Sequence, residues 1–172
     1  MTLDELNNMD NASASTWFEQ CCAAKTWIYH MVNARPYSSL ELLEQEARSA
    51  WAKCSDADYL EAFQANPMIG DIESLRKKFA NTKAIAAGEQ SGTADASETV
   101  LLQLKEANQA YLAKHGFIFI ICATGLSAEK MLSELQQRLP NSTTQEIINA
   151  SAEQLKITLL RINKALSTAS CA

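Results

Sequence analysis

The sequence predicts an all-α fold, a single-domain bundle of about seven or eight helices over residues 1–172. Three observations lead to this fold class. The chain of 172 residues is long enough for one packed core, is 47% hydrophobic, and has only 5 glycines and 3 prolines, a composition typical of compact helical proteins. Residue pairs that cap helix N-termini recur along it. A long apolar pattern at helical spacing follows near its end.

Three capping boxes divide the first part of the chain into predicted helices. In such a box, the first residue and the residue three positions later each cover a backbone N–H that the helix leaves free. The pairs are Thr16 with Glu19, Ser38 with Glu41, and Ser55 with Asp58. The predicted helices run from Trp17 to about Val32, then to about Lys53, then to a point before Pro67, since a proline disfavours helical geometry in the preceding residue.

Three further helices are predicted in the second part. The first begins at the pair Asp95 with Glu98 and ends at Gly116. The second begins after Ser127 and ends at about Leu139, before Pro140. The third begins at the pair Thr143 with Glu146. The last helix keeps one apolar face over most of its length, which predicts that this face packs in the core. The face consists of Ile148, Ala152, Leu155, Leu159, Ile162 and Leu166.

Three segments depart from the helical pattern. Asn66–Asp71 contains a proline and a glycine, and Lys83–Ala94 has small residues around a polar centre. Phe117–Ala123 has the composition of a buried strand, but no partner strand accompanies it, so we interpret it as an extended entry into a buried helix or as part of one. Irregular segments commonly present the functional groups of a helical scaffold.

Composition and charge argue against several classes of function. The net charge of -5 disfavours a nucleic-acid partner. The apolar run Phe117–Ala123 is far too short to span a membrane, and the polar, acidic Met1–Asn11 does not resemble a secretory signal. Five cysteines without a CxxC pair favour reduced thiols in the cytoplasm. With only two histidines, no metal site is expected.

Two polar residues in the irregular segments are candidate site residues, and each has a simpler interpretation. Asn66 precedes Pro67, so its side chain projects from a turn at a helix end; the simpler interpretation is that it only terminates the helix. Glu89 lies among small, neutral residues, where a carboxylate is able to accept hydrogen bonds from substrate N–H groups; the alternative is a solvated loop charge. His115 and Arg35 are interpreted as helix-end residues.

Several segments, in order and spacing, resemble the 2-oxo-4-hydroxy-4-carboxy-5-ureidoimidazoline (OHCU) decarboxylase family over roughly residues 15–166. No single motif is decisive, but the ordered set is specific. The matching segments are Phe18–Cys22, Trp27, Met31, Arg35–Tyr37, Trp51, Asp58–Phe63, Asn66–Asp71, Glu89–Gly92, Asn108 with Tyr111, Gly116–Gly125 and Leu160–Ile162.

The resemblance implies an all-helical, cofactor-free decarboxylase that forms a homodimer and converts OHCU to (S)-allantoin in urate breakdown. The family pattern reads His-Pro-x-Ile-Gly where this chain has Asn66-Pro67-Met68-Ile69-Gly70. The resemblance therefore assigns Asn66 the catalytic position, with Glu89 as the second catalytic group. It assigns substrate contacts to Pro67, Ala86, Ala87, Gly88, Gln90, Phe119, Ile120, Ile121, Cys122 and Ala123. Some relatives have arginine where Thr124 stands.

The implied chemistry explains why a histidine suits the catalytic position. Loss of CO2 leaves an electron pair on the ring carbon, and a proton must then reach one face. Histidine titrates near neutral pH and is able to take and give that proton, whereas an asparagine amide is not. We therefore expect Asn66 to impair the reaction. Two alternatives stay open: a protein that binds ligand without turnover, and a partner-binding helical protein with an exposed apolar stripe on the Trp17–Met31 helix.

Overall fold

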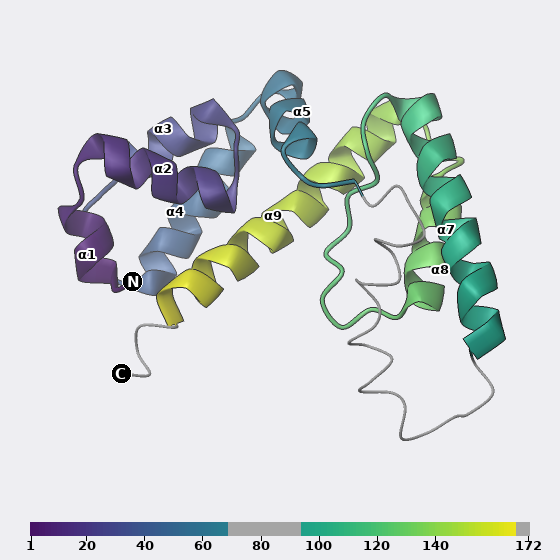
Figure 1. Ribbon diagram of the computed structural model, residues 1–172. Coiled ribbons are helices and arrows are strands. Elements are labelled where there is room, and N and C mark those ends of the chain that lie inside the picture. Colours follow the sequence, from purple (N-terminus) through teal and green to yellow (C-terminus); the bar gives the residue numbers. More distant parts are fainter. Residues whose placement is uncertain (69–93, 168–172) are drawn as a thin grey trace. The chain divides into compact units, whose positions relative to one another are not determined.

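The computed structural model describes residues 1–68 and 94–167, and all regular structure in them is helical (Figure 1). The eight helices described are α1 (Leu3–Asn8), α2 (Asn11–Cys21), α3 (Lys25–Asn33), α4 (Leu40–Ala52), α5 (Asp56–Gln64), α7 (Ala94–His115), α8 (Ala128–Arg138) and α9 (Thr143–Ser167). The predicted all-α class and helix number are confirmed. No helix among them has the length and apolar character that crossing a bilayer requires.

The chain divides into two compact units, each with its own core. The first comprises Met1–Asn66 with Asn149–Ala172, and the second comprises Pro67–Ile148. Helix α9 begins in the second unit and continues into the first. The predicted domain bounds, residues 1–172, stay a prediction.

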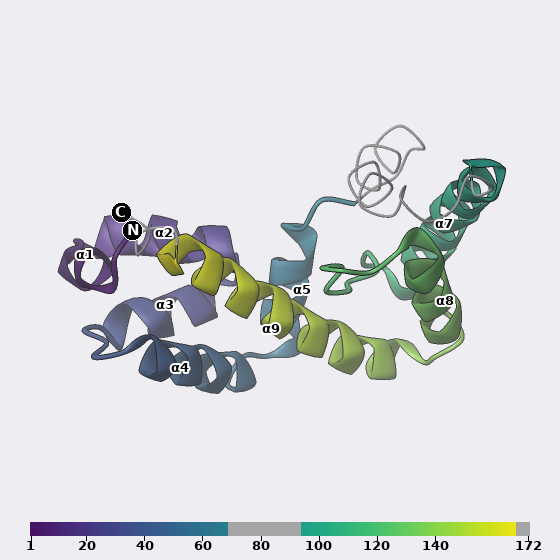
Figure 2. The same ribbon diagram turned by 90° about the horizontal axis from the view of Figure 1, so that it is seen from below.

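Aromatic side chains of α2 and α3 form the centre of the first unit's core. Phe18 and Trp27 are fully buried and meet edge-to-face with ring centroids 5.8 Å apart. The Trp27 indole Nε1 donates a hydrogen bond of 3.1 Å to the Ala47 carbonyl of α4, so its polar atom is satisfied inside the core. Burying a side chain of this size contributes about 1.5–3 kcal/mol. The C-terminal part of α9 runs beside α2 and adds Ile162 to the same core (Figure 2).

The predicted single helix from Trp17 to Val32 is wrong, because the chain breaks between α2 and α3. Thr16 lies inside α2 and its hydroxyl donates to the Ala12 carbonyl, so it caps nothing. A carboxylate from elsewhere in the chain starts the second helix: Glu61 accepts a 2.6 Å hydrogen bond from the Lys25 backbone N–H. This break depends on a tertiary contact and carries no local glycine or proline signal.

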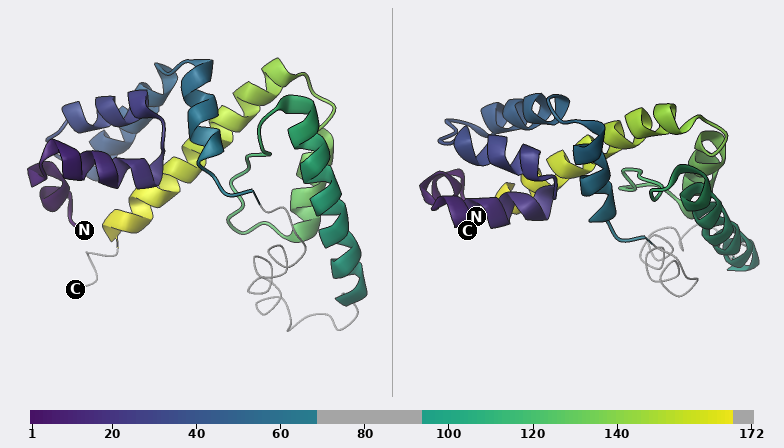
Figure 3. Two further views of the ribbon diagram at one scale, coloured as in Figure 1. Left: turned by 45° about the horizontal axis from the view of Figure 1, so that its top comes forward. Right: turned by 90° about the horizontal axis from the view of Figure 1, so that it is seen from above.

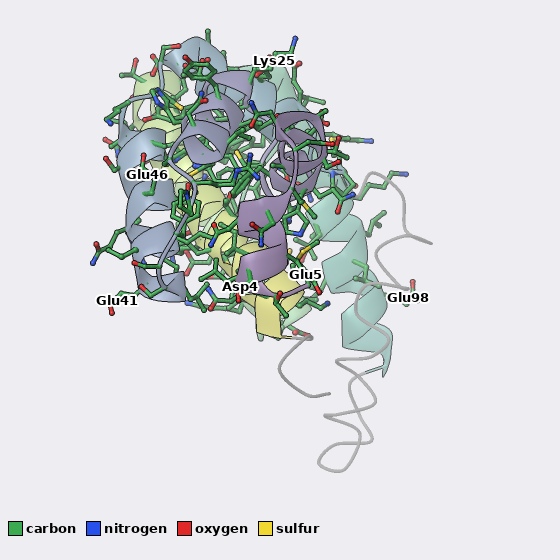
Figure 4. All side chains as sticks on the ribbon, turned by 90° about the vertical axis from the view of Figure 1, so that its left-hand side faces the viewer. Asp4, Glu5, Lys25, Glu41, Glu46 and Glu98 are labelled. Atoms are coloured by element: carbon green, nitrogen blue, oxygen red, sulfur yellow. The ribbon has the colours of Figure 1, made fainter. Side chains whose placement is uncertain are left out.

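Local capping chemistry was otherwise predicted to within a residue or two. The Ser55–Asp58 capping box, the Ser127 N-cap and termination at Gly116, where φ is +80°, are confirmed. Two boxes are shifted by one residue: Ser39 caps α4, and Ser142 supplies the hydroxyl at the start of α9. Helix α7 begins at Ala94, so Asp95 lies within it. Acidic residues occupy first turns at the surface, where Figure 4 shows Asp4 and Glu5 of α1 and Glu41 of α4.

The predicted core face of α9 is wrong over the first half of the helix. Ile148 is 57% exposed and Ala152 is also exposed. The buried face follows a four-residue spacing instead: Ala150, Gln154, Thr158 and Ile162. Gln154 and Thr158 are polar, so an apolar pattern could not reveal this face. Leu166 is buried as predicted, and Leu155 and Leu159 pack at the edge of the core.

The second unit is built on α7 and α8, which lie side by side (Figure 3). Leu104 of α7 and Leu135 of α8 are fully buried between them. Phe117–Ala123 has no regular secondary structure, and α8 begins only at Ala128. The interpretation of this segment as part of a helix is therefore wrong, and its interpretation as an extended entry into a helix stays a prediction. Phe119 and Ile121 pack against the α7–α8 core.

Arg35 and His115 have more specific roles than the helix-end functions predicted for them. Arg35 ties the N-terminal segment to α3, because its guanidinium donates 2.8 Å hydrogen bonds to the carbonyls of Leu6 and Met9. His115 is the last residue of α7 and is buried, with Nδ1 2.9 Å from the Thr143 hydroxyl.

Candidate active site

Asn66 lies immediately after α5, at the end of the helix that the Ser55–Asp58 box opens. Its backbone N–H donates to the Phe63 carbonyl at 3.2 Å, which closes the last turn. The predicted turn is therefore present. The side chain does more than terminate the helix, because it reaches α9.

Three hydrogen bonds fix the side-chain amide of Asn66. Asn66 Nδ2 donates to the Ala62 carbonyl at 3.2 Å and to Gln154 Oε1 at 2.6 Å. Asn66 Oδ1 accepts from a terminal nitrogen of Arg161 at 3.1 Å. Arg161 can only donate and a backbone carbonyl can only accept, so only one orientation of the amide satisfies both. Gln154 is itself held by the Thr158 hydroxyl at 3.3 Å.

Arg161 lies beside Asn66 at the candidate site, and the sequence analysis assigned it no function. The only signal was its place in the matching segment Leu160–Ile162, which carried no chemical role. In the structure its second terminal nitrogen donates to the Cys21 carbonyl at 3.1 Å. Its remaining N–H groups meet no acceptor among the residues that the structure describes. A guanidinium held in this way is well suited to bind a carboxylate.

A groove of about 340 Å³ opens beside Arg161 on the α2 side. It is lined by Trp17, Gln20, Cys21, Arg161, Lys164 and Ala165. Two cations on one apolar wall favour anions over cations in this groove. None of the predicted site residues that the structure describes lines it.

Burial makes the thiols next to this network poor nucleophiles. Desolvation raises the pKa of Cys21 to about 12, although the Arg161 charge acts in the opposite direction. The same effect raises the pKa of Cys22 to about 11. Both thiols are therefore neutral at physiological pH, and we assign them to packing.

The second predicted segment of the site, Phe119–Ala123, belongs to the second unit and is held there by Arg138. A terminal nitrogen of Arg138 donates to the Ile120 carbonyl at 2.6 Å, and the guanidinium carbon lies 4.6 Å from the centre of the Phe119 ring. Pro67 follows Asn66 and is exposed. The other predicted site residues, Ala86, Ala87, Gly88, Glu89 and Gln90, lie outside the described residues.

Comparisons with known proteins agree with this architecture. The family model described as OHCU decarboxylase matches residues 7–163. The "Uric acid degradation bifunctional protein TTL" of Arabidopsis thaliana is 35% identical over 148 residues, which cover 86% of this chain and 45% of that protein. The chain thus spans less than half the length of that relative.

Two further relatives are of similar length to the chain. The "2-oxo-4-hydroxy-4-carboxy-5-ureidoimidazoline decarboxylase" of Haloferax volcanii is 22% identical over 170 residues, 98% of each protein. A crystal structure of OHCU decarboxylase in the presence of (S)-allantoin superposes with a TM-score of 0.70 at 32% identity, covering 89% of this chain and 98% of that one. With a family match over residues 7–163 and the same helical architecture, the chain belongs to the OHCU decarboxylase family.

Proposed function

We propose that the protein decarboxylates OHCU to (S)-allantoin in urate breakdown, and that Asn66 slows this reaction. The hydrogen bond from Arg161 to Asn66 is the observation that carries the proposal. It brings a cation suited to a carboxylate to the position where the family motif has histidine. Family membership supports the substrate, and the contact supports the place of the chemistry.

The proposed reaction begins with the substrate carboxylate bound by Arg161 through the N–H groups that point to no described acceptor. Cleavage of the carbon–carboxylate bond releases CO2 and leaves its electron pair on the ring carbon. The adjacent C=N group accepts that pair as an enol-like anion, which nearby hydrogen-bond donors stabilise. A proton from water in this chain, or from an imidazole at position 66 in Asn66→His, then adds to one face of the ring and sets the configuration of allantoin.

Asn66 supports binding but not the proton step. Its Nδ2 group already donates to Ala62 and Gln154, and an amide does not take up and return a proton near neutral pH. A general acid–base group contributes about 10²–10⁴ in rate, and we expect a loss of that size here.

The remaining predicted site residues complete the proposal. Glu89 orients the ureido and ring N–H groups, with Ala86, Ala87, Gly88 and Gln90 around it. Pro67 contacts the substrate, and Phe119, Ile120, Ile121, Cys122 and Ala123 form a wall with backbone donors. The reaction chemistry requires no cofactor. A homodimer in the cytoplasm remains part of the proposal, in line with the resemblance.

The test replaces Asn66 by histidine and measures CO2 release and allantoin chirality with freshly prepared OHCU. We expect Asn66→His to raise kcat by about 10²–10⁴ over the natural chain. Asn163→His is the matched control. Asn163 is a half-buried asparagine of α9 that lies outside the candidate site, and its side chain donates to Glu44 at 2.6 Å. If neither the natural chain nor Asn66→His converts OHCU, the proposed activity is wrong.

A second candidate is a binding protein that keeps the pocket without turnover. The observation in its favour is the amide of Asn66, whose two N–H groups are both engaged in the protein. Calorimetric binding of allantoin to both Asn66 and Asn66→His proteins, with no CO2 from either, would identify it.

A further inference from the structure

Arg138, the last residue of α8, is fixed on three sides inside the second unit. Its Nε donates to Glu146 Oε1 at 2.8 Å, and a terminal nitrogen donates to the Ile120 carbonyl at 2.6 Å. The Phe119 ring lies against the guanidinium, 4.6 Å from its carbon. Only 11% of the side chain is exposed. A planar cation enclosed in this way has one orientation, and its hydrogen bond fixes the direction of the Ile120 carbonyl.

The carboxylate that holds Arg138 is itself fully buried and saturated with donors. Glu146 is 0% exposed and also accepts from the Tyr111 hydroxyl at 2.5 Å and from Asn141 Nδ2 at 3.0 Å. A buried ion pair with well-packed apolar surroundings is often no more stable than its hydrophobic replacement. We therefore look for the role of the Arg138–Glu146 pair in the orientation that it gives to Arg138 and not in its contribution to stability.

The hydrogen bond from Arg138 to the Ile120 carbonyl also orients the peptide group between Ile120 and Ile121. The bond is trans, so the Ile120 carbonyl and the Ile121 N–H point in opposite directions. With the carbonyl aimed at Arg138, the N–H is aimed away from it. The N–H meets no acceptor among the residues that the structure describes. A cation on the carbonyl also polarises the peptide, which makes its N–H a stronger donor.

We propose that Arg138 is a positioning residue for the decarboxylation: by binding the Ile120 carbonyl, it aims and polarises the Ile121 N–H as a donor to the charge that develops on the substrate. The inference rests on the proposed function, because Phe119–Ala123 is the substrate wall in that proposal. Arg138 does not touch the substrate. It acts through one peptide group, and its carboxylate partner Glu146 keeps it in place.

The sequence allows that one peptide group to be observed almost in isolation. Only two Ile–Ile bonds occur in the chain, Ile120–Ile121 and Ile147–Ile148. In protein labelled with ¹³C at the isoleucine carbonyl and ¹⁵N at the isoleucine amide, a carbonyl–amide correlation spectrum contains only these two signals. The second signal, from helix α9, is an internal reference.

The first arm uses the natural chain and needs no variant. Titration with (S)-allantoin should shift the Ile120–Ile121 signal and leave the Ile147–Ile148 signal nearly unchanged. Calorimetry on the same samples establishes that allantoin binds. If allantoin binds and the Ile120–Ile121 signal does not move, the inference is overturned.

The second arm uses Arg138→Lys, which keeps the charge but loses the planar fork that bridges Glu146 and Ile120. We expect the Ile120–Ile121 signal to change position before ligand is added. In the Asn66→His background, kcat should fall about 10–100-fold with KM within about twofold, since a donor to developing charge acts mainly in the transition state. Lys130→Gln, which breaks the exposed Lys130–Glu134 pair on the same helix, is the control and should change neither value.

The outcomes separate the two proposals. No allantoin binding and no CO2 release, even with Asn66→His, refutes the proposed function, and the inference falls with it. Turnover that is unchanged by Arg138→Lys refutes the inference alone. If Arg138→Lys does not fold, the titration of the natural chain still decides the matter.

Discussion

Arg161 donates a 3.1 Å hydrogen bond to the side-chain oxygen of Asn66, across 95 residues of sequence. The same guanidinium also holds the Cys21 carbonyl at the end of α2. The side chain of Asn66 is thus held by a cation and does not simply project from the turn after α5. The electrostatic consequences of this contact lead to the first two predictions.

The imidazole introduced by Asn66→His should titrate below the ordinary histidine value of about 6.5, because the neighbouring Arg161 charge disfavours its protonated form. The protonated imidazole is the form that delivers the proton, so the activity gained should decline as pH rises through this lowered pKa, at a lower pH than for an unperturbed histidine. A pH profile of kcat/KM, together with NMR titration of the imidazole, measures this directly. An imidazole pKa at or above 6.5 contradicts the prediction.

Arg161→Gln should weaken binding of the substrate far more than binding of the product. OHCU carries the carboxylate that the reaction removes, and allantoin lacks it. Loss of a charge-assisted hydrogen bond costs about 1.5–3 kcal/mol, so KM for OHCU should rise by roughly 10–100-fold. The calorimetric affinity for allantoin should change much less.

Lys164→Gln is the matched control for that variant, because it removes the other cation of the groove without touching Asn66. KM for OHCU should stay within about threefold of its value in the unsubstituted chain, because an exposed charge at long distance contributes little to binding. Equal losses for Arg161→Gln and Lys164→Gln would show that general charge, and not the Arg161 contact, governs binding.

Gln154→Leu should destabilise the fold through the same network. Gln154 is 1% exposed, and its Oε1 is the acceptor for Asn66 Nδ2 at 2.6 Å. Leucine has similar bulk but leaves that donor unpaired, which costs about 1–3 kcal/mol. Urea denaturation measures the change.

A double-mutant cycle isolates the contact between Gln154 and Asn66. In the Asn66→Ala background the donor is already absent, so Gln154→Leu should cost less there. Equal costs in the two backgrounds would mean that the loss comes from packing alone.

The buried thiols predict an alkaline limit to stability. Burial raises the pKa of Cys21 to about 12, of Cys22 to about 11 and of Cys54 to about 12, so each thiol is harder to ionise in the folded chain than in the unfolded one. Their contribution to stability is complete below the unfolded pKa of about 8.5 and is lost as pH rises toward the folded values.

The free energy of unfolding should therefore decline between about pH 9 and 11. Replacing Cys22 by alanine, a smaller apolar residue, should flatten that decline while lowering stability at pH 7. In the native protein at pH 8, a thiol reagent should modify the half-buried Cys122 before Cys21, Cys22 or Cys54. Rapid reaction of all four would contradict the burial described for three of them.

Features that depend on neighbouring residues in sequence were predictable. The Ser55–Asp58 box and the Gly116 terminator each depend on a few consecutive residues, and both are confirmed. The break between α2 and α3 was missed because the Glu61 carboxylate that caps Lys25 comes from α5. The face of α9 was misplaced because its buried centre is polar at Gln154 and Thr158.

The residues of the candidate site also divide into those that local sequence identified and those that only the fold brings together. Asn66 was identified from a contiguous motif, and in the structure its side chain bonds to Gln154 and Arg161. Arg161 had no chemical signal in sequence, since an arginine on a helix is ordinarily a surface residue. Only the fold brings it to Asn66 from 95 positions away. Likewise, nothing local connects Arg138 to Ile120.

Gln154 also bears on how the residue at position 66 can change. Gln154 Oε1 accepts a hydrogen bond from Asn66 Nδ2 at 2.6 Å, and it can equally accept one from an imidazole N–H at position 66. The Gln154 side chain therefore suits either an asparagine amide or an imidazole at position 66 without a compensating substitution. Exchange between the two at position 66 is accordingly a single reversible step, in which the scaffold is conserved and only the capacity to transfer a proton is gained or lost.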